Sequence, residues 1–356
     1  MATVPVIQLN PGDKLIEDVI TPLGGTLFYK GKVVFQREKE ILQAFLIPSV
    51  SIESKEPKPN DKETLEEAAK EEETKERLSF NREYDQLFAL MSNVFRTVSA
   101  GGALPVLEIR TQLEKLLAQA DQYHILTFVP KNLNVSQYMI HSGILTALTS
   151  FTLAKWHGLP QKDWTPVALA GLLHDIGNAK VDEAILYKPS ALTVDERTEM
   201  RKHTTIGYNI LKPIPSLNEG VKLSALQHHE REDGSGYPLG LTTEKIHPYA
   251  KIIAITDVYH AMTSPRFYKK ETSKYLVLDQ LFQESFGKLD PAFVQTFITK
   301  VTQLHNGILI RLSDGRIGEI VFTDRSNPTR PMVNVQGTIV NLAMERNLFI
   351  QEVINS

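Results

Sequence analysis

Residues 165–174 would form a helix with apolar side chains on every face, and this feature constrains the fold more than any other in the chain. The segment contains the unbroken run Leu169–Leu173 and ends in His174. A helix that is apolar all round must lie at the centre of a large domain. The chain therefore needs several further helices that surround this one.

Amphipathic helices are available on both sides of this segment. Apolar residues at three- and four-residue steps predict helices within 84–95 and 113–117, and further helices over 136–156, over 250–263 and twice between 273 and 301. Thr193 with Glu196, and Ser216 with Glu219, have the spacing of capping boxes, which predicts two more helix starts. We therefore expect a mainly α protein with a large all-α bundle.

The two ends of the chain have a different pattern. Short apolar runs broken by Pro and Gly predict strands near 26–29 and 33–35 with one helix near 39–45, and the tail has a hairpin turn at Asp314-Gly315. Residues 54–78 are charged and lack large apolar side chains, so they cannot form a core. The predicted domains are a small β-rich N-terminal domain (1–53), a charged linker with a solvated helix in its second half (54–78), a helical packing segment (79–131), the central bundle (132–303) and a small β-rich C-terminal domain (304–356).

Composition excludes several classes of chemistry and partner. The chain has 356 residues and no cysteine, so any metal must be bound by His, Asp, Glu or water. Its net charge of −3 provides no basic field for a polymeric nucleic acid. No long uninterrupted apolar stretch occurs, and residues 1–10 have no basic patch before a continuous apolar stretch, so we expect a cytoplasmic protein without a membrane partner.

Carboxylates and imidazoles interrupt the most apolar helices. Asp175 follows the apolar run directly, Asp257 lies just after Ile252–Ile255, and His141 shares a helix face with Leu145. A buried carboxylate without a cationic or hydrogen-bonded partner is costly. Each of these residues alone is compatible with a structural role, but several together are typical of a metal site inside a helical bundle.

The spacing of these residues places them on different helices. The intervals 175–203 and 229–257 are both 28 residues long, which is room for one helix and a loop. Two carboxylates and five imidazoles exceed the need of one ion, so the number predicts two metals that share a bridging carboxylate. The predicted ligands are His141, His174, Asp175, His203, His228, His229 and Asp257.

The His174-Asp175 doublet at the end of a buried helix resembles the HD phosphohydrolase superfamily. The stretch from His228 through His229-Glu230-Arg231 to Gly236-Tyr237-Pro238 is similar to the signature of its HD-GYP branch. The resemblance covers roughly residues 132–303. It implies an HD-type all-α bundle, in agreement with the periodicity, and it does not extend to the β-rich domains that the pattern predicts on either side.

The resemblance also implies an activity and site roles. Family members hydrolyse cyclic di-GMP to pGpG, and some continue to GMP, through a hydroxide activated by two divalent transition metals, often iron or manganese. By this resemblance Asp175 is the bridging ligand and acts with His174 in catalysis, and the other predicted ligands complete the centre. Positions matched to the substrate side are Gly236, Tyr237, Pro238, Arg266 and Lys269, and we expect Asn178, at the position of a family lysine, and the nearby Lys180 to lie on the same side.

Three positions depart from the family pattern. The family doublet commonly continues Ile-Gly-Lys, but here Asn178 replaces the lysine, and only Lys180 is near enough in sequence to substitute for it. Gln137 stands where members with a third metal have glutamate, which favours two metals. His260 stands where aspartate is common.

Three functions remain open from the sequence. The first is a cyclic di-GMP phosphodiesterase. The second is a catalytically weak cyclic di-GMP sensor or adaptor, which Asn178 favours and which would act through signalling protein partners or a homodimer. The third is an HD phosphohydrolase of another nucleotide, which the doublet alone would allow.

Overall fold

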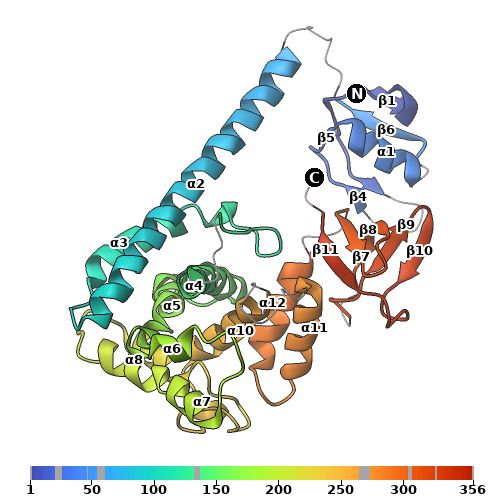
Figure 1. Cartoon of the computed structure of the whole chain (residues 1–356). Helices are drawn as coiled ribbons and strands as arrows, with labels where there is room; N and C mark the ends of the chain where they lie inside the picture. The colour runs from blue at the N-terminus through green and yellow to red at the C-terminus, as the bar shows by residue number, and fades with distance from the viewer. Residues whose placement is uncertain are drawn as a thin grey trace. The chain divides into compact units, whose positions relative to one another are not determined.

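A computed structural model describes residues 2–20, 26–45, 47–53, 61–131, 137–263, 273–303, 307–324 and 327–354. The chain divides into two compact units, Met1–Lys75 and Glu76–Ser356. Helices make up most of the second unit, and small antiparallel sheets occur near both ends of the chain (Figure 1). The predicted fold class is therefore confirmed.

In the described part of residues 2–53, the N-terminal unit has short antiparallel strand pairs and the helix α1 (Gln36–Ala44). Its core contains Leu15, Val34 and Leu42, all almost fully buried. The predicted helix and the strands near 26–29 and 33–35 are present. The elements are β1 (Ala2–Pro5) paired with β6 (Ser49–Ile52), β2 (Asp13–Lys14) with β5 (Val33–Val34), β3 (Val19–Ile20) with β4 (Thr26–Phe28), and helix α1 (Gln36–Ala44).

Helix α2 (Asp61–Ser99) begins inside the segment predicted as a linker. From Phe80 onward its apolar residues recur at helical spacing, and Leu87 and Met91 are buried in the core of the second unit. The chain turns at Gly101, whose positive φ favours glycine, and continues into α3 (Val106–Leu117). The predicted packing helices are present here.

Helices α4 (Tyr138–His157) and α5 (Gln161–Leu173) form the centre of the bundle. They pack closely because of two glycines: a Cβ at Gly171 would lie 3.0 Å from the Ala147 backbone, and one at Gly143 would lie 3.2 Å from the Leu172 carbonyl oxygen. Residues Val167–Leu173 are all buried, as the apolar pattern predicts.

The remaining helices surround this pair (Figure 1). The capping box at Thr193 is confirmed, because its side chain accepts from the Glu196 amide and Glu196 accepts in return. The predicted box at Ser216 is wrong, because the Asn218 side chain caps that helix by accepting from the Gly220 amide. The helices are α6 (Glu183–Leu186), α7 (Val194–Arg201), α8 (His203–Leu211), α9 (Glu219–Gln227), α10 (Pro248–Thr263), α11 (Lys274–Glu284) and α12 (Pro291–Gln303).

The C-terminal strands form one antiparallel sheet in the order β10-β9-β8-β7-β11. The turn at Asp314-Gly315 joins β7 (Leu309–Leu312) to β8 (Ile317–Phe322), as predicted. Ile310 and Ile320 belong to the same hydrophobic cluster as the helices. The domain border at 304 stays a prediction. The strands are β7 (Leu309–Leu312), β8 (Ile317–Phe322), β9 (Met332–Val335), β10 (Thr338–Asn341) and β11 (Ile350–Val353).

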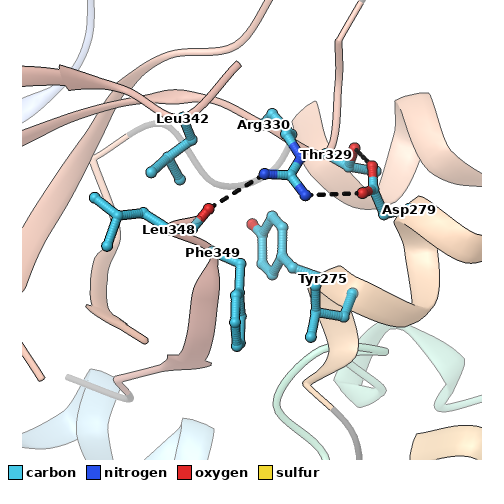
Figure 2. Close-up of a pocket in the computed structure, with 8 residues that line it drawn as sticks. Tyr275, Asp279, Thr329, Arg330, Leu342, Leu348 and Phe349 are labelled. Atoms are coloured by element: carbon cyan, nitrogen blue, oxygen red, sulfur yellow. Dashed lines mark hydrogen bonds and ion pairs between the residues drawn. The ribbon is translucent and has the colours of Figure 1, made fainter. Parts of the chain in front are cut away.

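A small polar cluster joins the sheet to α11 (Figure 2). Arg330 forms an ion pair of 3.1 Å with Asp279 on α11 and donates a hydrogen bond to the carbonyl oxygen of Leu348. The Thr329 hydroxyl donates to the same carboxylate over 2.7 Å. This cluster stabilises the contact between the sheet and the bundle. Among the described residues, no helix combines the length and the apolar character that crossing a membrane requires.

Candidate metal centre

Six of the seven predicted ligands lie at or near helix ends within the bundle. His141 is in the first turn of α4, and Asp257 is inside α10. The other five stand where one element ends or the next begins: His174 caps the C-terminus of α5, Asp175 precedes the 3-10 helix Ile176–Lys180, His203 begins α8, and His228 and His229 follow α9. Contributions from five helices, as the 28-residue intervals predict, bring side chains distant in sequence together.

Four of the seven form a compact donor cluster. One ligand atom from each of Asp175, His203, His228 and His229 lies within 4.8 Å of the others. Oδ1 of Asp175 lies 3.2 Å from Nε2 of His203 and 3.6 Å from Nε2 of His228. Oxygen and nitrogen donors in this arrangement suit a divalent metal ion.

His174 and Asp257 extend the cluster on the other side of Asp175. Nε2 of His174 lies 3.5 Å from Oδ2 of Asp175 and 3.6 Å from Oδ1 of Asp257. The two oxygens of Asp175 therefore face different imidazoles. The imidazole of His174 is inaccessible to solvent, whereas the Asp175 carboxylate is 25% exposed. Solvent can therefore reach the centre from the carboxylate side.

Backbone carbonyls orient three of the imidazoles. The Nδ1 atoms of His174, His203 and His228 lie 2.7–2.9 Å from the carbonyl oxygens of Gly171, Met200 and Ser224, respectively. A carbonyl can only accept, so Nδ1 carries a proton in each imidazole and Nε2 is the atom left to bind a metal. Metal-binding histidines are commonly held in this way.

The charges of the cluster shift the pKa values of its members. Burial opposes charge on both carboxylates, but nearby histidines outweigh it and hold the pKa of Asp175 and of Asp257 below the usual range, with His174 the chief contributor to both. Burial also opposes charge on His174, yet Asp175 and Asp257 raise its pKa to about 9. Burial lowers the pKa values of His203 and His229. Two ionised carboxylates beside the neutral imidazoles of His203 and His229 are a donor set for a cation, and a metal ion would replace the extra proton of His174.

His141 lies slightly apart from the four-residue cluster. Its ring is buried, and burial lowers its pKa to about 4. Nδ1 lies 2.9 Å from the Tyr84 hydroxyl, while Nε2 is buried without a hydrogen-bond partner. Nε2 of His174 likewise has no hydrogen-bond partner. Buried nitrogen atoms without partners are rare, and a bound cation would satisfy both.

The loop that contains Gly236, Tyr237 and Pro238 packs against the cluster. The Tyr237 ring stacks on His229, with centroids 4.7 Å apart and planes 27° apart. Gly236 is required because a Cβ there would come within 2.4 Å of the Glu230 backbone. The buried carboxylate of Glu230 accepts from two backbone amides of the same loop. The loop is thus fixed beside the predicted ligands, with Pro238 directly after Tyr237.

Two of the remaining residues predicted on the substrate side, Asn178 and Lys180, lie in the described part of the chain. Asn178 is buried, and its Oδ1 has no hydrogen-bond partner. Lys180 donates to the Ser99 carbonyl oxygen at the end of α2, over 2.9 Å. Arg266 and Lys269 lie outside the described residues.

The other two family departures are polar residues outside the donor cluster. Gln137 is exposed and precedes α4 directly. His260 is buried and its Nε2 lies 2.7 Å from the Thr149 hydroxyl. Burial lowers the pKa of His260 to about 3, so it is a neutral core histidine.

Sequence reasoning missed two residues beside the centre. Tyr84 was visible only as an apolar position of a packing helix. Arg201 is exposed, and its guanidinium carbon lies 4.7 Å from the centroid of the Tyr237 ring. Its position two residues before His203 was the available signal.

Comparisons with known proteins agree with this site. The model of the HD domain family matches residues 114–293. A cyclic di-GMP phosphodiesterase of Pseudomonas aeruginosa is 32% identical over 69% of this chain and 60% of its own length. One of Borreliella burgdorferi is 31% identical over 58% of this chain and 54% of its own. A cyclic di-GMP phosphodiesterase response regulator of Xanthomonas campestris is 37% identical over 43% of this chain and 40% of its own.

The matched region thus spans between 40% and 60% of these relatives. The family match covers the bundle and includes all seven predicted ligands. His141 lies on α4, and the other six lie on α5, α8, α9 and α10 or directly beside them. The sequence signature, the donor cluster and the family match agree, and this chain belongs to the HD domain family, in its HD-GYP branch.

Proposed function

We propose that this protein is a metal-dependent phosphodiesterase that hydrolyses cyclic di-GMP to linear pGpG. The observation that carries the proposal is the donor cluster of Asp175, His203, His228 and His229, which lies directly beside the HD-GYP loop. The names of the relatives support the substrate. Hydrolysis of a phosphodiester requires an activated water and neutralised phosphoryl oxygens, and this site can organise both.

The seven ligands would hold two transition-metal ions, and iron or manganese is compatible with a mixed set of imidazole and carboxylate donors. His203, His228 and His229 would bind one ion, and His141, His174 and Asp257 the other. Asp175 would bind both, since its two oxygens face different imidazoles. When bound, the ions would activate water and neutralise charge on the scissile phosphate.

The chain's own residues would orient the site and the substrate. Backbone carbonyls hold the imidazoles of His174, His203 and His228 with Nε2 directed to the centre. The Tyr237 ring covers His229 and would exclude water from that side. Arg201, which forms no ion pair within the described part of the chain, would bind a phosphate of the dinucleotide at the edge of Tyr237. Arg266 and Lys269 would contribute further cations.

A matched pair of variants tests the proposal. His203→Ala should abolish turnover of cyclic di-GMP by manganese- or iron-loaded protein. His157→Ala removes a partly buried histidine at the end of α4 that bonds to Thr296, and should leave turnover near the wild-type value. Product chromatography would measure both. A His203→Ala variant that is folded and fully active would contradict the proposal.

A cyclic di-GMP sensor with a weak catalytic site is the second candidate. It is favoured by Asn178 in place of the family lysine and by the contact between Lys180 and Ser99, which engages the nearest alternative cation. Metal-loaded protein that binds cyclic di-GMP at micromolar concentration but forms no product would support the sensor. Turnover of deoxynucleotides or guanosine tetraphosphate in a parallel panel would instead indicate another HD phosphohydrolase.

A further inference from the structure

Helix α2 contacts one predicted metal ligand from outside the HD domain match. The match covers residues 114–293, whereas Tyr84 and Phe88 lie on α2. The Tyr84 hydroxyl is 2.9 Å from Nδ1 of His141, and the Phe88 ring stacks on the same imidazole with centroids 4.4 Å apart. The His141 ring is therefore held from α2 by a hydrogen bond and by an aromatic face.

The hydrogen bond of His141 differs in kind from those of the other ligands. His174, His203 and His228 each face a carbonyl oxygen, which fixes the proton on Nδ1. A tyrosine hydroxyl can donate or accept, so it is compatible with either tautomer of His141. Only when the hydroxyl accepts from Nδ1 does Nε2 have a free lone pair for a metal.

The surroundings of Nε2 favour the arrangement in which the Tyr84 hydroxyl accepts from Nδ1. Nε2 of His141 is buried and has no hydrogen-bond partner. A proton there would be an unsatisfied buried donor, whereas a lone pair is satisfied by a cation. The contact of Gly143 with Leu172 lies two residues from His141 on one helix and two residues from His174 on the other. His174 Nε2 also lacks a hydrogen-bond partner.

We propose that Tyr84 is a positioning residue for the metal centre: its hydroxyl accepts a hydrogen bond from the Nδ1–H group of His141, which leaves the lone pair of Nε2 directed to the ion. The inference rests on the proposed metal centre but not on the substrate. Loss of such a supporting hydrogen bond typically lowers metal affinity about tenfold to hundredfold. Tyr84→Phe keeps the aromatic packing and removes only the hydroxyl.

Tyr123→Phe is the matched control. Tyr123 is also a buried tyrosine, it contacts the same Phe128 ring, and its hydroxyl bonds to Thr149, which in turn bonds to His260 rather than to a predicted ligand. Both variants lose one buried hydroxyl and its hydrogen bond. A general effect of packing or stability should therefore appear in both.

The experiment titrates metal-free protein with Mn²⁺ and follows free Mn²⁺ by electron paramagnetic resonance. His141→Ala defines the affinity step that depends on this ligand. Tyr84→Phe should weaken that step about tenfold to hundredfold, and Tyr123→Phe should leave it unchanged. Wild-type affinity in Tyr84→Phe, an equal loss in Tyr123→Phe, or no loss in His141→Ala would overturn the proposal.

A spectroscopic measurement tests the tautomer itself. Long-range ¹H–¹⁵N spectra of metal-free protein with labelled histidine should show the His141 proton on Nδ1, with His141→Ala providing the assignment. Tyr84→Phe should shift the proton toward Nε2, and Tyr123→Phe should not. A wild-type proton on Nε2 would overturn the proposal. Absence of cyclic di-GMP turnover would contradict the proposed activity, but it would leave both of these results standing.

Discussion

Nε2 of His203 lies 3.3 Å from Nε2 of His228 in the buried centre. Both imidazoles have their Nδ1 proton directed to a backbone carbonyl, so two lone pairs face each other across this distance. The arrangement is unfavourable unless a positive charge satisfies both nitrogens. Asp175, whose Oδ1 lies beside both atoms, completes a set of donors that a divalent cation would satisfy.

Metal should therefore stabilise the fold. We expect Mn²⁺ at a hundredfold excess over its Kd to contribute about 2.7 kcal/mol to the free energy of unfolding and to raise Tm by several degrees. His228→Ala should remove most of this increase because it deletes a ligand. Differential scanning calorimetry with metal and with chelator measures the effect. Equal Tm values under both conditions in the wild type would contradict a metal site here.

Asp175 is the ligand with the largest expected effect on metal content. Asp175→Ala should lose both ions, whereas Asp257→Ala should lose one, because only Asp175 faces imidazoles with both oxygens. Elemental analysis of the purified variants gives the number of ions per chain, and circular dichroism checks the fold. A folded Asp175→Ala protein with full metal content would refute the bridging role.

In the metal-free protein, the free energy of unfolding should depend on pH through the titration of His174. Burial disfavours its charged form, but Asp175 and Asp257 outweigh burial and raise its pKa from 6.5 to about 9. A raised pKa in the folded state stabilises the fold fully below pH 6.5, and this contribution is lost as pH rises through 9. Burial lowers the pKa values of His203 and His229, so their contribution to the free energy of unfolding has the opposite sign. It decreases as pH falls below 6.5, where the unfolded chain binds protons that the folded one does not.

The free energy of unfolding in chelator should accordingly be highest near neutral pH. Asp257→Asn should weaken the decline between pH 7 and 9, because it removes one of the two carboxylates that hold the His174 proton. Urea unfolding at a series of pH values measures both effects. A decline of the same size in Asp257→Asn would show that another group causes it.

Arg201 should affect substrate affinity. Arg201→Ala should raise KM for cyclic di-GMP about tenfold to hundredfold, the effect of losing a charge-assisted contact of about 1.5–3 kcal/mol. Arg197→Ala removes an exposed arginine from the same helix α7 and is the matched control. Steady-state kinetics at fixed ionic strength would separate them. Equal KM values for the two variants would exclude a specific phosphate contact at Arg201.

Asn178 is the position at which the chain departs from its family. If a lysine here neutralises a phosphate oxygen in the transition state, Asn178→Lys should raise kcat about tenfold or more. Lys180→Ala should leave kcat unchanged, because the Lys180 ammonium contacts the Ser99 carbonyl. An unchanged kcat in Asn178→Lys together with a lower kcat in Lys180→Ala would assign the phosphate contact to Lys180 instead.

Much of this architecture could be predicted from local patterns. The all-apolar segment before His174 predicted the buried helix at the centre, because burial on every side leaves no polar face. The 28-residue intervals predicted that ligands come from separate helices, and Asp175 does meet His203 and His228. The capping box predicted at Ser216 is wrong because the cap lies two residues later, where the Asn218 side chain accepts a hydrogen bond from the Gly220 amide.

The contacts from α2 could not be predicted in this way. Tyr84 and His141 are 57 residues apart, and in the sequence Tyr84 is only one apolar position in an amphipathic helix. Whether its hydroxyl meets a ligand depends on how α2 packs against α4, which periodicity does not determine. In the sequence Arg201 differs from the other charges of α7 only by its place two residues before His203, and this does not predict that its guanidinium lies over Tyr237.

The most direct test of the proposed activity is a single-turnover reaction of manganese-loaded protein with cyclic di-GMP in ¹⁸O-labelled water. Hydrolysis predicts linear pGpG with one ¹⁸O atom in its new terminal phosphate, detected by mass spectrometry, and no product with His203→Ala. Recovery of intact cyclic di-GMP from fully metal-loaded wild-type protein would contradict the account.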